Sequence, residues 1–222
     1  MTGPDLRLEE ETGGLVAGVD EAGRGPWAGP VVAAAVVLDR AQLPEVLDDS
    51  KKLSARRREA LFEAIMETAR VGIGIAEVAE IDALNILRAN DLAMCRAVDG
   101  LAPALRAVPP PAPTHPPARS GAARDAGELS VLIDGNRVPP GFPVPAQAIV
   151  KGDARSLSIA AASIIAKVTR DRIMDELAAA HPGYGWESNR GYGTAAHREA
   201  LLRLGPTPHH RVSFRPVRDI LV

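Results

Sequence analysis

Short apolar runs of strand length, separated by segments with helical spacing, limit this chain to a mixed α/β sheet. The first two runs are close together, as in a hairpin, and strands and helices alternate after them. The apolar runs predict strands at 15–19, 31–38, 71–78, 129–133 and 146–150. Helical spacing predicts helices at 55–70, 81–98, 157–180 and 194–204. We expect Ser54 to cap the first helix, and Leu61, Ile65 and Met66 to share its apolar face.

Composition favours one soluble domain with a small appendage. The chain has 222 residues, of which 46% are hydrophobic and only 3% aromatic, so the core must consist of Ala, Val, Leu and Ile. The net charge of −2 means that affinity for nucleic acid must come from a local basic patch. We find neither a signal-peptide pattern nor an apolar run near the roughly 18 residues of a membrane span. We therefore expect a cytoplasmic monomer. The single cysteine, Cys95, excludes an internal disulfide and is expected to be buried.

A segment rich in proline and alanine interrupts this pattern before the fourth predicted strand. It runs from Pro109 to Asp125 without hydrophobic periodicity, so we predict a disordered insertion at about 108–127 that loops away from the site. The rest predicts a single domain at 14–222, preceded by a flexible N-terminus at 1–13. Its last part, about 190–222, is expected to be a small helical unit with a basic tail.

Two adjacent carboxylates, Asp20 and Glu21, follow the first predicted strand. Side chains alternate along a strand, so these two converge on one ligand only where the strand ends and the backbone turns. Gly23 and Gly25, on either side of Arg24, permit such a turn and leave the backbone open to a ligand. Carboxylates beside exposed backbone N–H groups can hold a hard cation next to an anionic substrate.

Further acids follow other predicted strands. Asp134 comes after Val-Leu-Ile, and Asp153 comes after Ala-Ile-Val-Lys-Gly. Acids at several strand ends can meet in space, and clustered carboxylates need a cation between them. Mg²⁺ or Mn²⁺ fits oxygen ligands, and two such ions suit in-line phosphodiester cleavage. Alone, Asp134 also fits an Asp-Gly turn and Asp153 a helix N-cap. Asp171 is a rival fourth ligand that we expect to form a surface ion pair instead.

The motifs, taken in order, resemble those of bacterial ribonuclease HII, the type 2 ribonuclease H. They cover roughly residues 14–216. The matching segments are Gly18-Val-Asp-Glu-Ala-Gly-Arg-Gly-Pro26, Ala28-Gly-Pro-Val-Val32, Asp49-Ser-Lys-Lys-Leu-Ser54, Ile81-Asp-Ala-Leu-Asn-Ile-Leu87, Leu132-Ile-Asp-Gly-Asn136, Lys151-Gly-Asp153, Ala160 to Asp171, Gly191-Tyr192, and His209-His-Arg-Val-Ser-Phe214.

The resemblance implies a ribonuclease H-like mixed sheet flanked by helices, with a helical C-terminal part. It implies an endonuclease that hydrolyses RNA in RNA/DNA hybrids and cuts 5′ of single ribonucleotides embedded in duplex DNA. Mn²⁺ or Mg²⁺ is the implied cofactor, with two ions when substrate is bound. The implied catalytic set is Asp20, Glu21, Asp134 and Asp153, the first three as metal ligands. Gly23, Arg24 and Gly25 are implied to sense the ribose 2′-hydroxyl, and Tyr192 to stack on the following deoxyribose.

One departure from the family pattern concerns Tyr192. The family usually has Gly-Tyr-Pro-Thr, whereas this chain has Gly191-Tyr192-Gly193-Thr194. A glycine in place of proline predicts a looser backbone after Tyr192.

Lysine is rare in this chain. Only four of the 26 basic residues are lysine, and all four lie in segments singled out above. We expect them on or just behind the acidic cleft, with Lys51 and Lys52 contacting substrate; the others are Lys151 and Lys167. Scattered surface positions are the alternative.

Other functions fit the sequence less well. Gly-Arg-Gly-Pro is neither of the common nucleotide-binding glycine motifs, which disfavours a nucleotide-binding module. A glycosidase normally depends on sugar-stacking aromatics, and this chain is poor in aromatic residues. A DNA nuclease of the same fold is the closest rival. Ribonuclease HIII carries an extra N-terminal domain, and only 14 residues precede the first predicted strand here.

Overall fold

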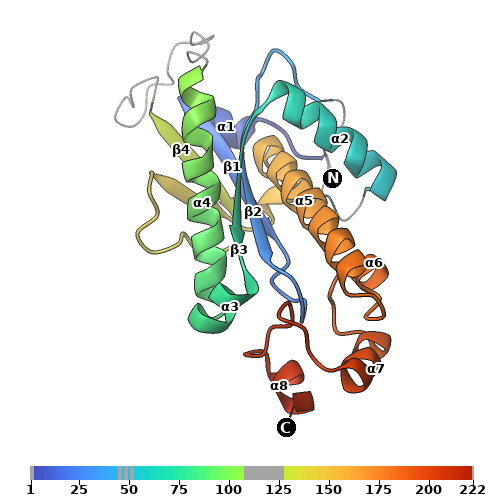
Figure 1. The fold of residues 1–222 in the computed structure, drawn as a ribbon. Coiled ribbons are helices and arrows are strands. Elements are labelled where there is room, and N and C mark those ends of the chain that lie inside the picture. Colours follow the sequence, from blue (N-terminus) through green and yellow to red (C-terminus); the bar gives the residue numbers. More distant parts are fainter. Residues whose placement is uncertain (1–2, 45–46, 48–49, 51–52, 108–127, 222) are drawn as a thin grey trace.

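The structure is a computed structural model that describes residues 3–44, 47, 50, 53–107 and 128–221. The predictions for Lys51, Lys52 and the insertion at 108–127 lie outside the described residues. In the described part, the chain folds into a sheet with helices on both faces and a helical extension at one end (Figure 1).

The sheet has five strands in the order β3-β2-β1-β4-β5. Their bounds are Leu15–Ala22 for β1, Val31–Val37 for β2, Arg70–Ala76 for β3, Leu129–Asp134 for β4 and Ala146–Ile149 for β5. β2 pairs antiparallel with β1 and β3, whereas β4 pairs parallel with β1 and β5. The prediction of a mixed sheet is therefore confirmed, and β1 lies at its centre.

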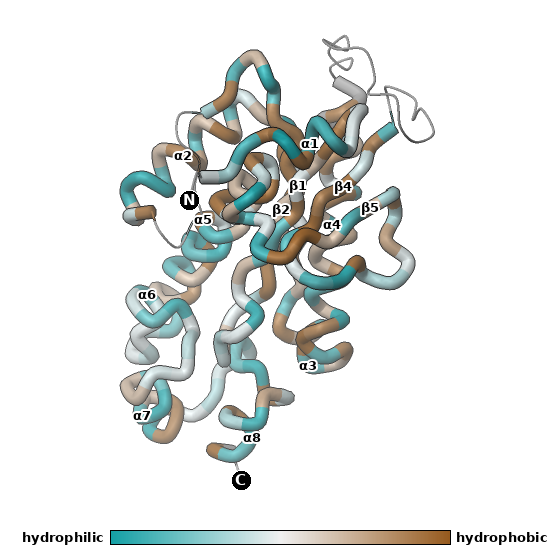
Figure 2. Tube along the Cα trace, turned by 180° about the vertical axis from the view of Figure 1, so that it is seen from behind, coloured by the Kyte–Doolittle hydropathy of each residue, from teal (hydrophilic) through white to brown (hydrophobic). Residues whose placement is uncertain are grey.

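Helices cover the two faces of the sheet. Their bounds are Arg7–Thr12 for α1, Ala55–Thr68 for α2, Val78–Leu84 for α3, Ile86–Ala107 for α4, Leu157–Ala180 for α5, Trp186–Asn189 for α6, Ala195–Leu204 for α7 and Arg215–Leu221 for α8. A 3₁₀ turn, η1, spans Gly152–Ala154. Figure 1 shows α4 and α5 on opposite sides of the strands. Figure 2 shows hydrophobic residues following the central strands that these helices cover.

The core on the two faces of the sheet is built mainly from small aliphatic side chains, as the composition predicts, whereas a separate cluster in the C-terminal part includes the buried aromatic residues Tyr184 and Trp186. One cluster packs α4 against β1, β2 and β4, and includes Ala17, Val19, Ala93 and Ile133. A second cluster packs α5 and α2 against the opposite face, and includes Ala34, Ile65 and Ile164. Alternate residues of β1 therefore face different helices. This alternation decides where the acids of β1 point.

The prediction of a single helix at 81–98 is wrong. The chain forms α3 and α4, which are separated at Asn85, a residue with φ of 73°. The Asn85 side chain accepts hydrogen bonds from the N–H groups of Leu87 and Arg88 and so starts α4. Val78, predicted to end a strand, instead belongs to α3.

Smaller differences concern three other regions. Ser54 caps α2 as predicted, yet Met66 is 44% exposed and Phe62 is buried in its place. Cys95 is only half-buried. The N-terminal segment, predicted to be flexible, contains α1, whose Glu9 is buried and accepts a hydrogen bond from the Ser158 N–H of α5. No helix in the described part of the chain is long and apolar enough to cross a membrane.

Candidate active site

Asp20 and Asp134 are neighbours on adjacent parallel strands. Val19 of β1 pairs with Ile133 of β4, so the next position along each strand carries a carboxylate. Val19 and Ile133 both pack on the α4 side. Because side chains alternate, Asp20 and Asp134 both point to the α5 side of the sheet. The expectation that strands far apart in sequence bring their acids together holds for this pair.

The Asp20 carboxyl group is buried and hydrogen-bonded. The residue is 5% exposed, and one carboxyl oxygen accepts a hydrogen bond of 2.7 Å from the Glu21 N–H. Ser163 of α5 hydrogen-bonds the same carboxyl group, and its hydroxyl lies 2.7 Å from the buried hydroxyl of Ser50. Burial raises the pKa of Asp20 well above its usual value, and the charges of Glu21 and Asp134 raise it further. A cation beside these acids would offset that repulsion.

Glu21 is not placed as the sequence predicts. The sequence places Asp20 and Glu21 after the end of the strand, but β1 continues through both residues to Ala22. Neighbouring strand residues point to opposite faces, so Glu21 leaves the sheet on the side away from Asp20. Its carboxylate accepts a hydrogen bond of 3.1 Å from the Arg24 guanidinium. Backbone pairing with β2 keeps this segment extended, because Glu21 and Ala22 pair with Ala33 and Val32.

Asp134 is connected directly to the segment that carries Asp153. One Asp134 oxygen accepts a hydrogen bond of 2.7 Å from the Gly152 N–H. Asp153 follows in η1 and is buried. The alternative that Asp153 caps α5 is wrong, because Ser156 occupies that position and accepts from the Ile159 N–H.

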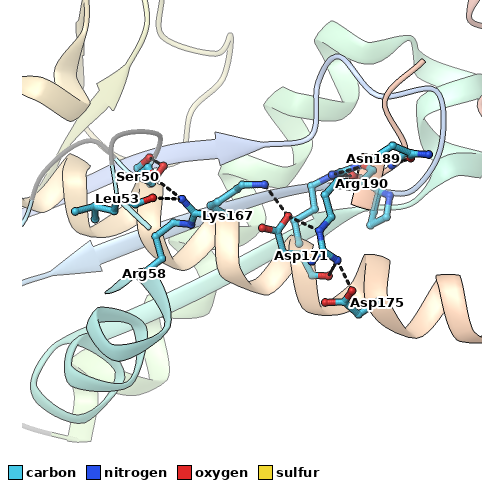
Figure 3. Close-up of polar contacts among 12 residues, drawn as sticks. Ser50, Leu53, Arg58, Lys167, Asp171, Asp175, Asn189 and Arg190 are labelled. Carbon is cyan, nitrogen blue, oxygen red and sulfur yellow. Dashed lines mark hydrogen bonds and ion pairs between the residues drawn. The ribbon is translucent and has the colours of Figure 1, made fainter. Parts of the chain in front are cut away.

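Asp171 forms the ion pair that the sequence predicts. Its carboxylate lies 2.7 Å from the Lys167 ammonium group and 3.9 Å from the Arg190 guanidinium (Figure 3). Arg190 also pairs with Asp175. Lys167 is thereby directed along α5 toward Asp171. Lys151 is exposed in the turn just before Gly152.

The four acids of the candidate site have the chemistry of ligands for a hard divalent cation. Asp20, Glu21, Asp134 and Asp153 offer only carboxylate oxygens, which such ions prefer. In the described residues, no three His, Cys, Asp or Glu side chains are arranged so that they could hold a metal ion as they stand. The charges of Glu21 and Asp134 nevertheless act on Asp20, because both raise its pKa.

Two buried arginines support the loop between β1 and β2. Arg170 of α5 donates to the carbonyls of Ala28, Pro30 and Arg190. The contacts of Arg211 are with the carbonyls of Gly23, Arg24, Gly29 and Pro30. Burial lowers the pKa of Arg170 to about 10 and that of Arg211 to about 9, so both stay charged near neutral pH. Both arginines lie within motifs that resemble those of ribonuclease HII, but residue type alone does not predict their supporting role.

The two glycines of this loop serve different purposes. Gly23 has φ of 96°, and an added Cβ would lie 2.0 Å from Arg170 Nε. The space at Gly23 is therefore filled by the protein itself. An added Cβ at Gly25 would lie 3.4 Å from Tyr192 Cε1, which is ordinary contact. Tyr192, 49% exposed, thus lies beside Gly25, so the structure brings these two predicted substrate residues together.

Comparison with known proteins identifies the family. The chain matches the ribonuclease HII family model at residues 17–109 and 120–217. Ribonuclease HII of Jannaschia sp. (strain CCS1) is 57% identical over 219 residues, covering 99% of this chain and 98% of that protein. The crystal structure of ribonuclease H2 from Pyrococcus horikoshii OT3 covers 92% of this chain and 96% of its own, with a TM-score of 0.66 and 26% identity.

A further solved structure agrees in fold. Bst-RNase HIII in complex with Mn²⁺ covers 96% of this chain and 71% of its own, with a TM-score of 0.71 and 21% identity. The sheet order, the acids on β1 and β4, and the near full-length match to curated relatives agree with one another. The chain therefore belongs to the ribonuclease HII family and is a ribonuclease H.

Proposed function

We propose that this enzyme cuts 5′ of single ribonucleotides embedded in duplex DNA, as well as the RNA strand of RNA/DNA hybrids, and that Asp20, Glu21, Asp134 and Asp153 are its catalytic acids. The observation that carries this assignment is the pair of carboxylates on β1 and β4. Asp20 and Asp134 lie side by side on one face of the sheet, and their repulsion raises the pKa of Asp20. Such a pair is costly unless a cation binds to it.

We propose Asp20, Glu21 and Asp134 as ligands of Mn²⁺ or Mg²⁺, with Asp153 near a second ion when substrate is bound. The Mn²⁺ complex of Bst-RNase HIII supports this choice of metal. Such ions activate a water molecule and stabilise the leaving oxygen of the phosphodiester. The hydroxyl groups of Ser163 and Ser50 orient Asp20, and the Gly152 N–H orients Asp134. Cleavage would leave a 5′-phosphate on the downstream product.

We propose that Gly23, Arg24 and Gly25 read the ribose 2′-hydroxyl through their backbone. The Arg211 guanidinium donates hydrogen bonds to the carbonyls of Gly23 and Arg24. In a trans peptide, the N–H group points away from the carbonyl of the same unit. The N–H groups of Arg24 and Gly25 are therefore directed away from Arg211. We propose that Tyr192, beside Gly25, packs on the next sugar, where a second 2′-hydroxyl would clash.

The substrate assay tests this function. A labelled DNA duplex with one ribonucleotide should be cut only with Mg²⁺ or Mn²⁺, and an all-DNA duplex should stay intact. Cutting of the all-DNA duplex would favour a DNA nuclease of the same fold. We also propose that the enzyme acts as a cytoplasmic monomer, which light scattering with size-exclusion chromatography tests for the oligomeric state.

The Asp134→Asn variant tests the acidic set. It should lose cleavage while keeping its fold, and its melting temperature without metal should rise because repulsion with Asp20 is relieved. Asp171→Asn is the matched control, because Asp171 is engaged with Lys167 instead, and it should keep its activity. Full activity of Asp134→Asn at saturating Mg²⁺ would refute the assignment.

A further inference from the structure

The backbone of Tyr192 is held by a buried histidine. His197, on α7, is fully buried, and its Nδ1 lies 2.9 Å from the Tyr192 carbonyl oxygen. A carbonyl can only accept a hydrogen bond, so His197 Nδ1 must carry the proton. The neutral imidazole then has an acceptor at Nε2.

A second histidine supplies a donor to that acceptor. His210 Nε2 lies 3.2 Å from His197 Nε2. His210 Nδ1 accepts a hydrogen bond of 3.0 Å from the Thr207 N–H, so the His210 proton is on Nε2. The donors therefore run in one direction, from Thr207 through His210 and His197 to the Tyr192 carbonyl.

Trp186 confirms which nitrogen of His197 accepts. Its indole N–H, which can only donate, points at His197 Nε2 from 3.1 Å. Two donors thus converge on His197 Nε2. The opposite tautomer would set an N–H against both donors and leave the Tyr192 carbonyl facing an unprotonated nitrogen. The geometry allows only the tautomer with the proton on Nδ1.

Trp27 secures the chain on both sides of Tyr192. Its backbone N–H donates to the Gly191 carbonyl at 2.8 Å. An added Cβ at Gly193 would lie 2.0 Å from Trp27 Cε2, so the indole ring occupies the space that a proline there would need. The indole also lies 5.7 Å, between ring centroids, from His197. Gly193, predicted from the sequence to loosen this backbone, is therefore packed beneath a tryptophan.

We propose that His197 is a positioning residue for Tyr192. Its tautomer is set by His210 and Trp186, and together with Trp27 it holds the Tyr192 ring against Gly25. This inference rests on the proposed role of Tyr192 in substrate binding. His197 acts through the Tyr192 backbone and touches neither the acids nor the reacting atoms.

The tautomers can be measured without any assay of activity. Long-range ¹H–¹⁵N correlation spectra of protein with ¹⁵N-labelled histidine, recorded near pH 8, distinguish the two neutral forms. We expect the proton on Nδ1 for His197 and on Nε2 for His210, assigned with the His197→Asn and His210→Asn variants. A proton on Nε2 of His197 would overturn the proposal.

Two amide substitutions then test the function of the hydrogen bond. In His197→Asn, the side-chain amide nitrogen takes the place of Nδ1 and can still donate to the Tyr192 carbonyl. In His197→Gln, the amide group takes the place of Nε2 and cannot. We expect His197→Asn to keep most cleavage at an embedded ribonucleotide and His197→Gln to lose about tenfold, which is what one hydrogen bond is worth. Equal activity of the two variants would overturn the proposal.

The pattern over substrates separates positioning from plain stability. Loss of Tyr192 should reduce cleavage at a single ribonucleotide more than cleavage of long RNA/DNA hybrids, and His197→Gln should copy the Tyr192→Ala pattern. His181→Gln, in a histidine that packs on the same Trp186, is the control and should not copy it. Equal losses on both substrates with a lowered melting temperature would show a purely structural role. If the wild-type protein cuts neither substrate, the proposed function is wrong. The tautomer spectra would still test the hydrogen bonds from His210 through His197 to the Tyr192 carbonyl.

Discussion

At the scale of single residues, Arg170 and Arg211 fix the backbone of the glycine-arginine-glycine loop through hydrogen bonds. These two residues are 2% and 0% exposed, and their guanidinium groups donate to carbonyls of the loop between β1 and β2. Buried charges of this kind are tolerated when their hydrogen bonds are satisfied. The loop therefore has a preset backbone, which suits a site that reads a hydroxyl group with main-chain atoms.

This support predicts a difference between the two loop glycines. Gly23→Ala should lower the free energy of unfolding by about 2 kcal/mol, because the backbone is left-handed and the Cβ meets Arg170. Gly25→Ala should change it by less than about 0.5 kcal/mol, as at an ordinary surface position. Urea denaturation of both variants measures the two changes in the free energy of unfolding. We expect both to lose activity, Gly23→Ala through its structure and Gly25→Ala at the ligand. Equal stability of the two would contradict the packing described here.

At the scale of elements, the sequence predicted the strands and the long helices well. Apolar periodicity reports burial, and the five predicted strands and α2, α5 and α7 are confirmed. It could not place the break at Asn85, because a left-handed asparagine between two helices leaves the apolar spacing almost unchanged. It also ended β1 too early, since strand pairing with β2, and not local composition, keeps Asp20 and Glu21 extended.

The sequence predicted those site residues whose side-chain type by itself indicates their chemistry. Carboxylates after apolar runs pointed to Asp20 and Asp134, which the structure places together. The supporting residues were missed because their roles depend on the fold. His197 reaches the Tyr192 carbonyl only because α6, α7 and the segment up to His210 pack around it. No spacing in the sequence encodes that arrangement.

The buried histidines predict how stability depends on pH. Burial lowers the pKa of His210 from 6.5 to about 4, and the nearby rings of His197, His209 and His181 add to the effect. Between these two values the unfolded chain binds the proton that the folded chain refuses, so the free energy of unfolding should fall as the pH falls from about 6.5 to about 4. Denaturation in urea across this range should show a flatter dependence for His210→Asn than for the wild type. An unchanged slope would mean that His210 is protonated in the folded state.

At the scale of the whole molecule, the family match leaves a gap at residues 110–119. We predict that replacing these residues with a short linker changes the melting temperature little, because the entropy of closing a loop depends weakly on its length. Cleavage should persist. Differential scanning calorimetry with the ribonucleotide assay checks both, and a large fall in melting temperature would show that the segment packs on the body of the enzyme.

The parallel pairing of β1 with β4 has a consequence for how the enzyme folds. A parallel pair cannot form by a tight hairpin, and here β2, β3 and helices α2 to α4 intervene along the chain. Contacts between such distant segments form slowly, since chain entropy must be lost before they stabilise anything. Until β4 pairs with β1, Asp20 and Asp134 are not neighbours, although local hairpins and helices can already form. With Asp134 in the proposed catalytic set, we expect a newly made chain to cleave nucleic acid only after β4 has joined the sheet.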